Sequence, residues 1–205
     1  MIDIFEKNEK LDEFICHSGG AEGSDTIWEK EGVKYGVKTK AYSYKTKKHN
    51  SKNKVEISDK DYNEGVEKIK LANKTLMRFG IHRYMNLLAR NWTQVKYSSQ
   101  ILAIGYIVNP GDRGKKNYKN KSKYQVVDGG TGYAIQMAIN EEKLVFVFDQ
   151  DKNKWFRWSF VSLSFIESKT PKMNFKNFAG IGTREIKQNG INAIKEVYKQ
   201  IKNEK

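Results

Sequence analysis

Hydrophobic and polar positions along the chain follow two different periods. Short apolar runs near residues 14–17, 100–108 and 144–148 predict strands, as do the alternating residues 37–44 and the segment 175–180. Most of the segments between them place apolar residues at the three- to four-residue spacing of a helix that is covered on one face. Because strands that alternate with helices form parallel sheets layered by helices, we expect an α/β fold with a parallel sheet flanked by helices.

The individual segments predict the order of the elements. The runs at 100–108 and 144–148 are continuously apolar, as strands buried on both faces are. Helices are predicted from Ser58, a good N-cap residue, to Gly80, and over residues 81–95. The apolar positions of the second helix include Tyr84 and Trp92, with Arg90 among the polar positions on the rest of its surface.

The C-terminal part of the chain changes rhythm. Residues 149–168 predict a small antiparallel hairpin, whose Trp155, Phe156 and Trp158 either cover the edge of the sheet or stack on a ligand base, the first being the simpler interpretation. Residues 175–203 predict a strand and a helix that complete the sheet. The length of 205 residues suits one domain over residues 1–205.

Charge adds a second theme, since 38 basic and 24 acidic residues give a net charge of +14. Only six of the basic residues are arginine, the residue that nucleic-acid surfaces favour for bidentate contacts. A lysine- and asparagine-rich, proline-poor chain can instead reflect an A+T-rich genome, while binding of a polyanion or a small anion stays open. Much of the lysine lies in residues 45–54 and 115–123, which we expect to be polar surface loops.

Several functional classes are disfavoured by what the sequence lacks. The longest apolar stretch, residues 101–108, is too short to span a bilayer, and the N-terminus does not resemble a secretory signal. One cysteine, Cys16, allows no internal disulfide, so a cytoplasmic setting is expected. The three histidines, His17, His49 and His82, are scattered and predict no metal site, and no P-loop motif occurs.

Three predicted strand-to-helix junctions carry glycines, within residues 18–25, 128–132 and 180–185. Glycine allows a ligand to approach the backbone, and the first amides of a helix have no intrahelical partner. In a parallel sheet such junctions share one edge and can meet in one crevice. We therefore expect a seat for a ligand with several phosphates, although glycine also serves the geometry of such turns.

Four segments carry a resemblance to a known superfamily: residues 18–25 (SGGAEGSD), 88–95 (LARNWTQV), 129–136 (GGTGYAIQ) and 178–184 (FAGIGTR). Together they resemble the SLOG (SMF/LOG) Rossmann-like superfamily, its phage-encoded members in particular, over about residues 13–200. The resemblance implies a Rossmann-like sheet and a nucleotide-type ligand.

The order of these segments differs from that of many superfamily members, which begin with the Gly-Ile-Gly-Ser/Thr-Arg unit. Here that unit lies last, within residues 175–203, so the chain looks circularly permuted. This interpretation predicts that the strands around Ile15 and Phe178 are neighbours in the sheet. It also predicts that the N- and C-terminal regions lie close together.

The resemblance implies the ligand class more than a reaction. LOG enzymes cleave the N-glycosidic bond of nucleoside 5′-monophosphates with a Pro-Gly-Gly-x-Gly-Thr-x-x-Glu motif. In this chain Asp128 replaces the proline, Tyr133 replaces the threonine, and Ile135 and Gln136 stand where acidic residues are expected. The cleavage builds positive charge on the ribose, which a carboxylate stabilises far better than an amide does. A binder that performs no catalysis is therefore favoured over an enzyme.

Candidate site residues follow from the junctions and the resemblance. Weak candidates for an acid or base are Glu22, Asp25, Asp128 and Glu185. Arg184 is predicted to begin the last helix, where a cation is unfavourable unless it binds an anion, whereas Asp25 and Glu185 also fit as ordinary acids of a first turn. For His17 we favour a hydrogen-bonded position in the core over a role in binding a ligand. The expected ligand-binding residues are Ser18, Gly19, Gly20, Ala21, Ser24, Asp25, Arg90, Asn91, Gly129, Gly130, Thr131, Gly132, Gly180, Gly182, Thr183 and Arg184.

The sequence thus predicts a cytoplasmic, homodimeric or larger homo-oligomeric protein that binds a nucleotide or a nucleotide-derived signal of the cyclic-nucleotide or ADP-ribose type. No cofactor or metal is required for that role. Because the resemblance is to phage-encoded proteins, it implies by analogy a counter-defence role in which the signal is sequestered. Two alternatives stay open: a LOG-like hydrolase of an N-glycosidic or phosphate bond, and a basic protein associated with nucleic acid through its lysine loops.

Overall fold

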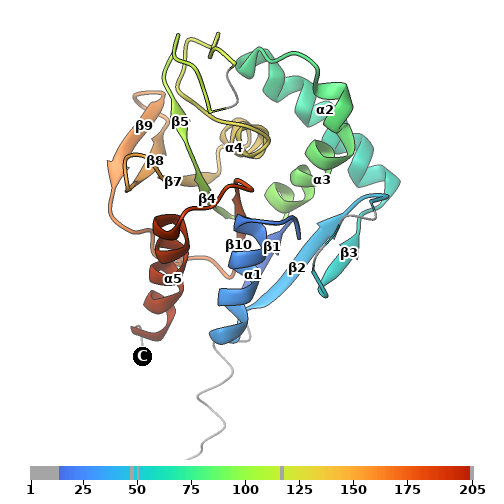
Figure 1. The fold of residues 1–205 in the computed structure, drawn as a ribbon. Coiled ribbons are helices and arrows are strands. Elements are labelled where there is room, and N and C mark those ends of the chain that lie inside the picture. Colours follow the sequence, from blue (N-terminus) through green and yellow to red (C-terminus); the bar gives the residue numbers. More distant parts are fainter. Residues whose placement is uncertain (1–13, 47–48, 50, 116–117, 204–205) are drawn as a thin grey trace, which may run out of the picture.

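The computed structural model describes residues 14–46, 49, 51–115 and 118–203. These residues form an eight-stranded sheet of order β3-β2-β1-β10-β4-β7-β8-β9 (Figure 1) and a separate antiparallel pair, β5-β6. The strands are β1 (Ile15–Ser18), β2 (Lys38–Ser43), β3 (Lys54–Glu56), β4 (Gln100–Gly105), β5 (Ile107–Val108), β6 (Val126–Val127), β7 (Leu144–Asp149), β8 (Lys154–Ser159), β9 (Ser164–Ser168) and β10 (Asn177–Gly182).

The predicted α/β class is confirmed. The neighbouring strands from β3 to β7 in the sheet pair in parallel, and β8 and β9 extend the sheet in antiparallel fashion, as the hairpin prediction requires. Trp155 and Trp158 are buried and pack edge-on against Phe148 and Phe165. These two aromatic residues therefore cover the end of the sheet and lie outside the cavity described below.

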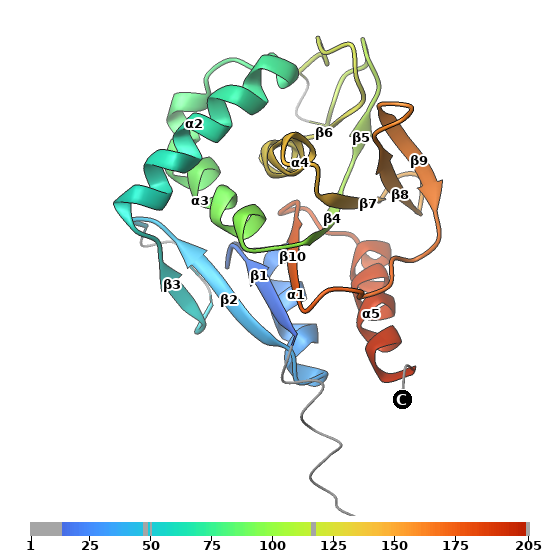
Figure 2. The ribbon, with the colours of Figure 1, turned by 180° about the vertical axis from the view of Figure 1, so that it is seen from behind.

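Helices cover both faces of the sheet. One layer contains α1 (Ser24–Lys34) and α5 (Gln188–Asn203), and the other contains α2 (Asp59–Leu76), α3 (Met85–Lys96) and α4 (Thr131–Asn140) (Figures 1 and 2). A 3-10 helix, η1 (Ile81–Tyr84), leads into α3. Among the described residues no helix is both long and apolar enough to cross a membrane.

Strand β4 shows why this sequence forms a two-sided core. Its side chains alternate, with Ile101 and Ala103 in the core below α2, α3 and α4, and Leu102 and Ile104 in the core below α1 and α5. All four are fully buried. A strand with solvent on one face would need polar residues at every second position, which explains the continuous apolar run.

The C-terminal strand β10 lies in the middle of the sheet, between β1 and β4. Cys16 of β1 pairs with Phe178 of β10 in parallel register, so the predicted neighbours are confirmed. The start of β1 and the end of α5 lie at the same end of the molecule in both views (Figures 1 and 2), and Phe14 and Ile201 belong to the same hydrophobic cluster. The terminal regions are therefore close together, as the permuted order predicts.

Two predicted elements differ from the structure near the helices of the site. The last helix begins at Gln188 and not at Arg184, so the prediction that Arg184 starts a helix is wrong. On α3 the polar residues Arg90, Asn91 and Gln94 are buried, while Tyr84 just before it is exposed. Arg90 and Asn91 are turned inward where they line the cavity described below, whereas Gln94 is buried away from it.

The described residues of the first lysine-rich loop make specific contacts with the rest of the protein. Ser51 and Asn53 both donate to Glu29 of α1 at 2.6 Å, and the ring of His49 lies where a side chain on Gly20 would be. Residues 47, 48 and 50 of this loop, and 116 and 117 of the second one, lie outside the described residues. In the second loop the buried Asn120 donates to the carbonyls of Val108 and Tyr124.

Close packing of α1 on the sheet generates the first prediction. A Cβ atom on Gly180 would lie 2.6 Å from Cγ of the fully buried Trp28, so Gly180→Ala should force a shift in the core and lower the free energy of unfolding by about 1–3 kcal/mol. Chemical denaturation measures the change. Gly130→Ala is the matched control, because Gly130 has an ordinary φ of −63° and its nearest neighbour is 3.6 Å away. Equal stability of the two variants would contradict this packing.

Candidate functional site

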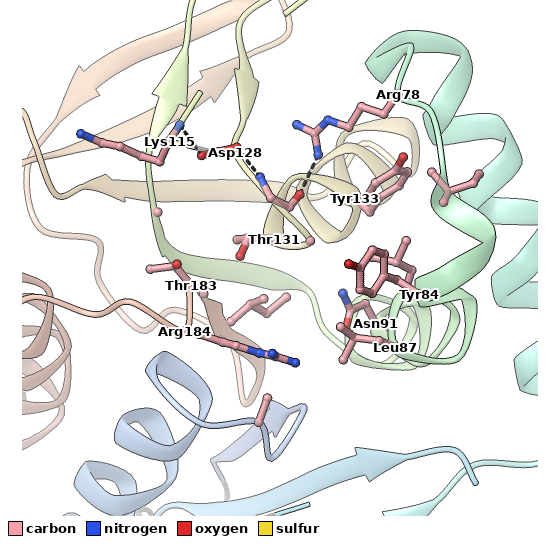
Figure 3. A pocket seen from close by; sticks show the side chains of 18 of the residues that line it. Arg78, Tyr84, Leu87, Asn91, Lys115, Asp128, Thr131, Tyr133, Thr183 and Arg184 are labelled. Atoms are coloured by element: carbon pink, nitrogen blue, oxygen red, sulfur yellow. Dashed lines mark hydrogen bonds between the residues drawn. The ribbon is translucent and has the colours of Figure 1, made fainter. Parts of the chain in front are cut away.

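A cavity of about 500 Å³ opens at the carboxyl ends of β4 and β10, the position at which parallel sheets bind ligands (Figure 3). The start of α4 forms one wall, and η1 with the first turns of α3 forms another. Its lining residues are Ala21, Asp25, Arg78, Phe79, Gly80, Ile81, Tyr84, Leu87, Leu88, Arg90, Asn91, Gly105, Tyr106, Lys115, Tyr118, Asp128, Gly129, Gly130, Thr131, Tyr133, Ile181, Gly182, Thr183, Arg184 and Glu185.

The structure brings residues from all three predicted junctions to this cavity, although not every predicted residue lines it. The ligand-binding candidates that do are Ala21, Asp25, Arg90, Asn91, Gly129, Gly130, Thr131, Gly182, Thr183 and Arg184. The candidates away from the wall are Ser18, Gly19, Gly20, Ser24, Gly132 and Gly180. Of the acid candidates, Asp25, Asp128 and Glu185 line the cavity, whereas Glu22 is exposed elsewhere on the loop.

The second glycine junction begins helix α4 without a side-chain cap. The first amides of a helix carry the positive end of its dipole, and Gly130 and Thr131 present this end to the cavity. Gly129 makes the turn with a φ of +62°, and its carbonyl accepts a 2.6 Å hydrogen bond from Arg78. Arg78 also donates to the Val127 carbonyl and the Tyr118 hydroxyl, so Nη1 and Nη2 of this arginine fix the junction.

Asp128 holds the same junction from the other side. One carboxylate oxygen accepts from the Gly129 amide at 2.7 Å and the other from the Lys115 amide at 2.8 Å (Figure 3). Both oxygens are therefore committed to backbone donors. This geometry gives Asp128 a structural part, tying the second lysine-rich loop to the start of α4.

The first junction contains a buried ion pair. Nη1 of Arg90 lies 3.8 Å from Oδ2 of Asp25, and both side chains are more than nine-tenths buried. Burial raises the pKa of Asp25 to about 6, while Arg90 and the amides of Ala21, Gly19 and Gly182 oppose that shift. Burial also lowers the pKa of Arg90, against the attraction of Asp25.

The third junction places the cation of Arg184 at the cavity, although Arg184 does not begin a helix. Arg184 follows β10 on an exposed segment, and Figure 3 shows its side chain extended into the cavity. Gln150 holds this segment, because it accepts from the Lys187 amide at 2.6 Å and donates to the Glu185 carbonyl at 3.2 Å. No described residue forms an ion pair or hydrogen bond with the guanidinium of Arg184, which leaves it available.

Two further polar side chains face the cavity without a partner among the described residues. The Asn91 amide and the Thr131 hydroxyl belong to residues that are each only 7% exposed, and neither group makes a hydrogen bond there. Arg90 Nη1 differs from these two groups, because it is itself buried without a hydrogen-bond partner. Because buried polar groups are normally satisfied, this atom indicates that a ligand or water completes the hydrogen bonding at this part of the cavity.

The wall formed by η1 and α3 is apolar and aromatic, and its residues Phe79, Tyr84, Leu87 and Leu88 were not expected at the site from the sequence. Tyr84 and Phe79 are 62% and 87% exposed, and Leu87 and Leu88 lie beside them on the wall. Tyr133 of α4 completes this face. The sequence does contain a signal for this wall. Large apolar residues follow the end of the helix near Met77 and Gly80, and they lack the regular spacing that would bury them in the core.

His17 is a hydrogen-bonded core residue, the position that we favoured for it. Its Nδ1 lies 2.8 Å from the Tyr42 hydroxyl and its Nε2 lies 3.0 Å from Oδ1 of Asn177, in a buried position. Within the described part of the chain, no set of three histidine, cysteine, aspartate or glutamate side chains could hold a metal ion.

Neither the family models, nor the curated proteins, nor the solved structures give a significant match. The resemblance to SLOG proteins therefore rests on the motifs alone, and a functional proposal rests on the geometry of the cavity.

The Asp25–Arg90 pair gives a pH prediction. The pKa of Asp25 is raised from 3.8 to about 6 by burial, so its contribution to stability is complete below about pH 4 and is lost as the pH rises through 6. Asp25→Asn should therefore gain stability relative to the wild type between pH 4 and pH 7.5, on the order of 2 kcal/mol. Urea denaturation at several pH values measures the difference.

The exposed carboxylate three residues earlier provides the control for this experiment. Glu22→Gln removes the same charge from a solvated position and should not change the pH dependence. A stability difference between wild type and Asp25→Asn that stays constant with pH, or that runs in the opposite direction, would contradict the raised pKa.

Proposed function

We propose that the protein binds a phosphorylated, nucleotide-type small molecule in this cavity, with the phosphate at the start of α4 beside Arg184 and the planar ring against the aromatic wall. One observation carries the proposal: the uncommitted groups of Arg184, Thr131 and Asn91 face one cavity at the carboxyl ends of the central strands. The other charged groups nearby, those of Arg78 and Asp128, are already engaged.

The chemistry of each end supports this orientation. A helix start and an arginine together suit a phosphate, because the amides and the guanidinium both donate to its oxygens. Tyr84 and Phe79 offer ring faces on which a planar base can stack. Asn91 lies between these ends, where its amide can both donate to and accept from the edge of a base or a ribose hydroxyl (Figure 3).

The biological role that fits such a binder is sequestration of a nucleotide signal in the cytoplasm of a host cell. The likeness of the motifs to phage-encoded SLOG proteins supports this part of the proposal, as it supports the cyclic-nucleotide or ADP-ribose type of ligand. The absence of acidic residues at Ile135 and Gln136 favours binding without cleavage. A protein of this kind returns its ligand chemically intact after denaturation, whereas a hydrolase yields products.

The third prediction tests the site directly. A thermal-shift panel of the four common nucleoside 5′-monophosphates, cyclic nucleotides, cyclic dinucleotides and ADP-ribose should contain at least one compound that raises the melting temperature. Ligand at 100 times its Kd adds about 2.7 kcal/mol to stability. By titration calorimetry, Arg184→Ala should weaken binding of that compound about tenfold or more, since a charge-assisted contact is lost.

Arg157→Ala provides the matched control, because Arg157 is an exposed arginine of β8 that lies outside the cavity wall. It removes the same charge and should leave the affinity within about twofold. The proposal is wrong if no phosphorylated compound shifts the melting temperature, or if both arginine variants weaken binding equally. Equal weakening together with a steep salt dependence would point to a nonspecific polyanion binder.

A further inference from the structure

Two amides of the first glycine loop, which resembles a phosphate seat in the sequence, are already engaged by the protein itself. The amide of Ser24 at the start of α1 donates to the Thr183 carbonyl at 3.1 Å, and the Ser24 hydroxyl donates to the same carbonyl at 2.8 Å. The Ala21 amide donates to Oδ2 of Asp25 at 3.5 Å. The amides of Gly19 and Gly182 act to lower the pKa of that carboxyl group, against the effect of burial.

The space that the glycines leave open is also filled. A Cβ atom on Gly19 would lie 1.4 Å from Nη1 of Arg90, so the guanidinium occupies the place of a side chain. A Cβ atom on Gly23 would lie 2.5 Å from the backbone of Arg184. These glycines therefore admit an arginine and a neighbouring strand end, and they leave no room for a phosphate between them.

The charge balance follows the same pattern. Asp25 lies 3.8 Å from Arg90 and offsets its charge at this end of the cavity, whereas Arg184 has no described partner. A phosphate placed here would compete with the Asp25 carboxylate for Arg90 and would be repelled by that carboxylate. The start of α4 also carries a carboxylate, Asp128, but both of its oxygens accept from the amides of Gly129 and Lys115, and Arg184, unpaired among the described residues, lines the same cavity.

We infer that Asp25 is an internal anion that fills the first glycine loop and thereby restricts the cavity to a ligand with a single phosphate group, which selects a mononucleotide, open or cyclic, over a ligand of the ADP-ribose type. This inference rests on the proposed function, since it names the residue that sets how many phosphate groups the same site accepts. The junction at α4 holds the one phosphate, and Asp25 discriminates against a second one attached to it. Asp25 is thus a specificity-determining residue and not a group that contacts the bound phosphate.

Inorganic phosphate and pyrophosphate are the probes for this inference, because neither carries a base. Titrations at pH 7.5 and constant ionic strength should show that the wild type binds pyrophosphate no more tightly than phosphate, despite the higher charge of pyrophosphate. Asp25→Asn should raise the affinity for pyrophosphate relative to phosphate at least fivefold. Glu22→Gln, which removes the same charge from the exposed part of the same loop, should leave the ratio unchanged.

The two proposals fail in different ways. If phosphate binds and Arg184→Ala weakens it, but Asp25→Asn leaves the ratio unchanged or Glu22→Gln changes it equally, the inference about Asp25 alone is wrong. If neither phosphate nor any compound of the panel binds, the proposed function is wrong. If Asp25→Asn does not fold, the wild type alone tests the inference. Pyrophosphate that binds the wild type tenfold more tightly than phosphate would overturn it.

Discussion

The position of β10 between β1 and β4 is the constraint on which the rest of the molecule depends. Without this strand the β1 side and the β4 side of the sheet have no common hydrogen bonds, and the two hydrophobic cores lose Phe178 and Ile181. The same strand ends at Gly182; the carbonyl of Thr183 after it accepts from the start of α1, and Arg184 follows at the cavity. Both the sheet and the cavity therefore depend on β10 and the residues that follow it.

Much of this fold can be predicted from the sequence, because buried parallel strands and one-sided helices have distinct periods. The runs that became β4, β7 and β10 are apolar at consecutive positions, and the helices between them keep a spacing of three to four residues. The exceptions have physical causes. The strand β3 has three exposed residues and so no hydrophobic signal, and Arg184 precedes α5 because Gln150 holds the intervening segment in another conformation.

The site was only partly predictable for a related reason. Glycine motifs indicate where the backbone turns, but they do not tell which atoms then occupy the space. Around Gly19 the occupant is the side chain of Arg90, which comes from a helix some 70 residues away in the chain. The aromatic wall of Tyr84 and Phe79 carries no motif at all. Such long-range pairings depend on tertiary packing, and a single sequence contains no direct record of them.

The two outer strands have a consequence for the behaviour of the protein in concentrated solution. Each edge of the sheet offers unpaired backbone groups to other copies of the chain, which is a common route to aggregation. The β3 edge is only three residues long and carries the ion pair of Lys54 with Glu56, and Glu167 of β9 pairs with Lys154. Adding a strand to either edge would disturb these solvated charges, which disfavours growth of the sheet from one molecule to the next, although Ile166 of β9 is itself exposed.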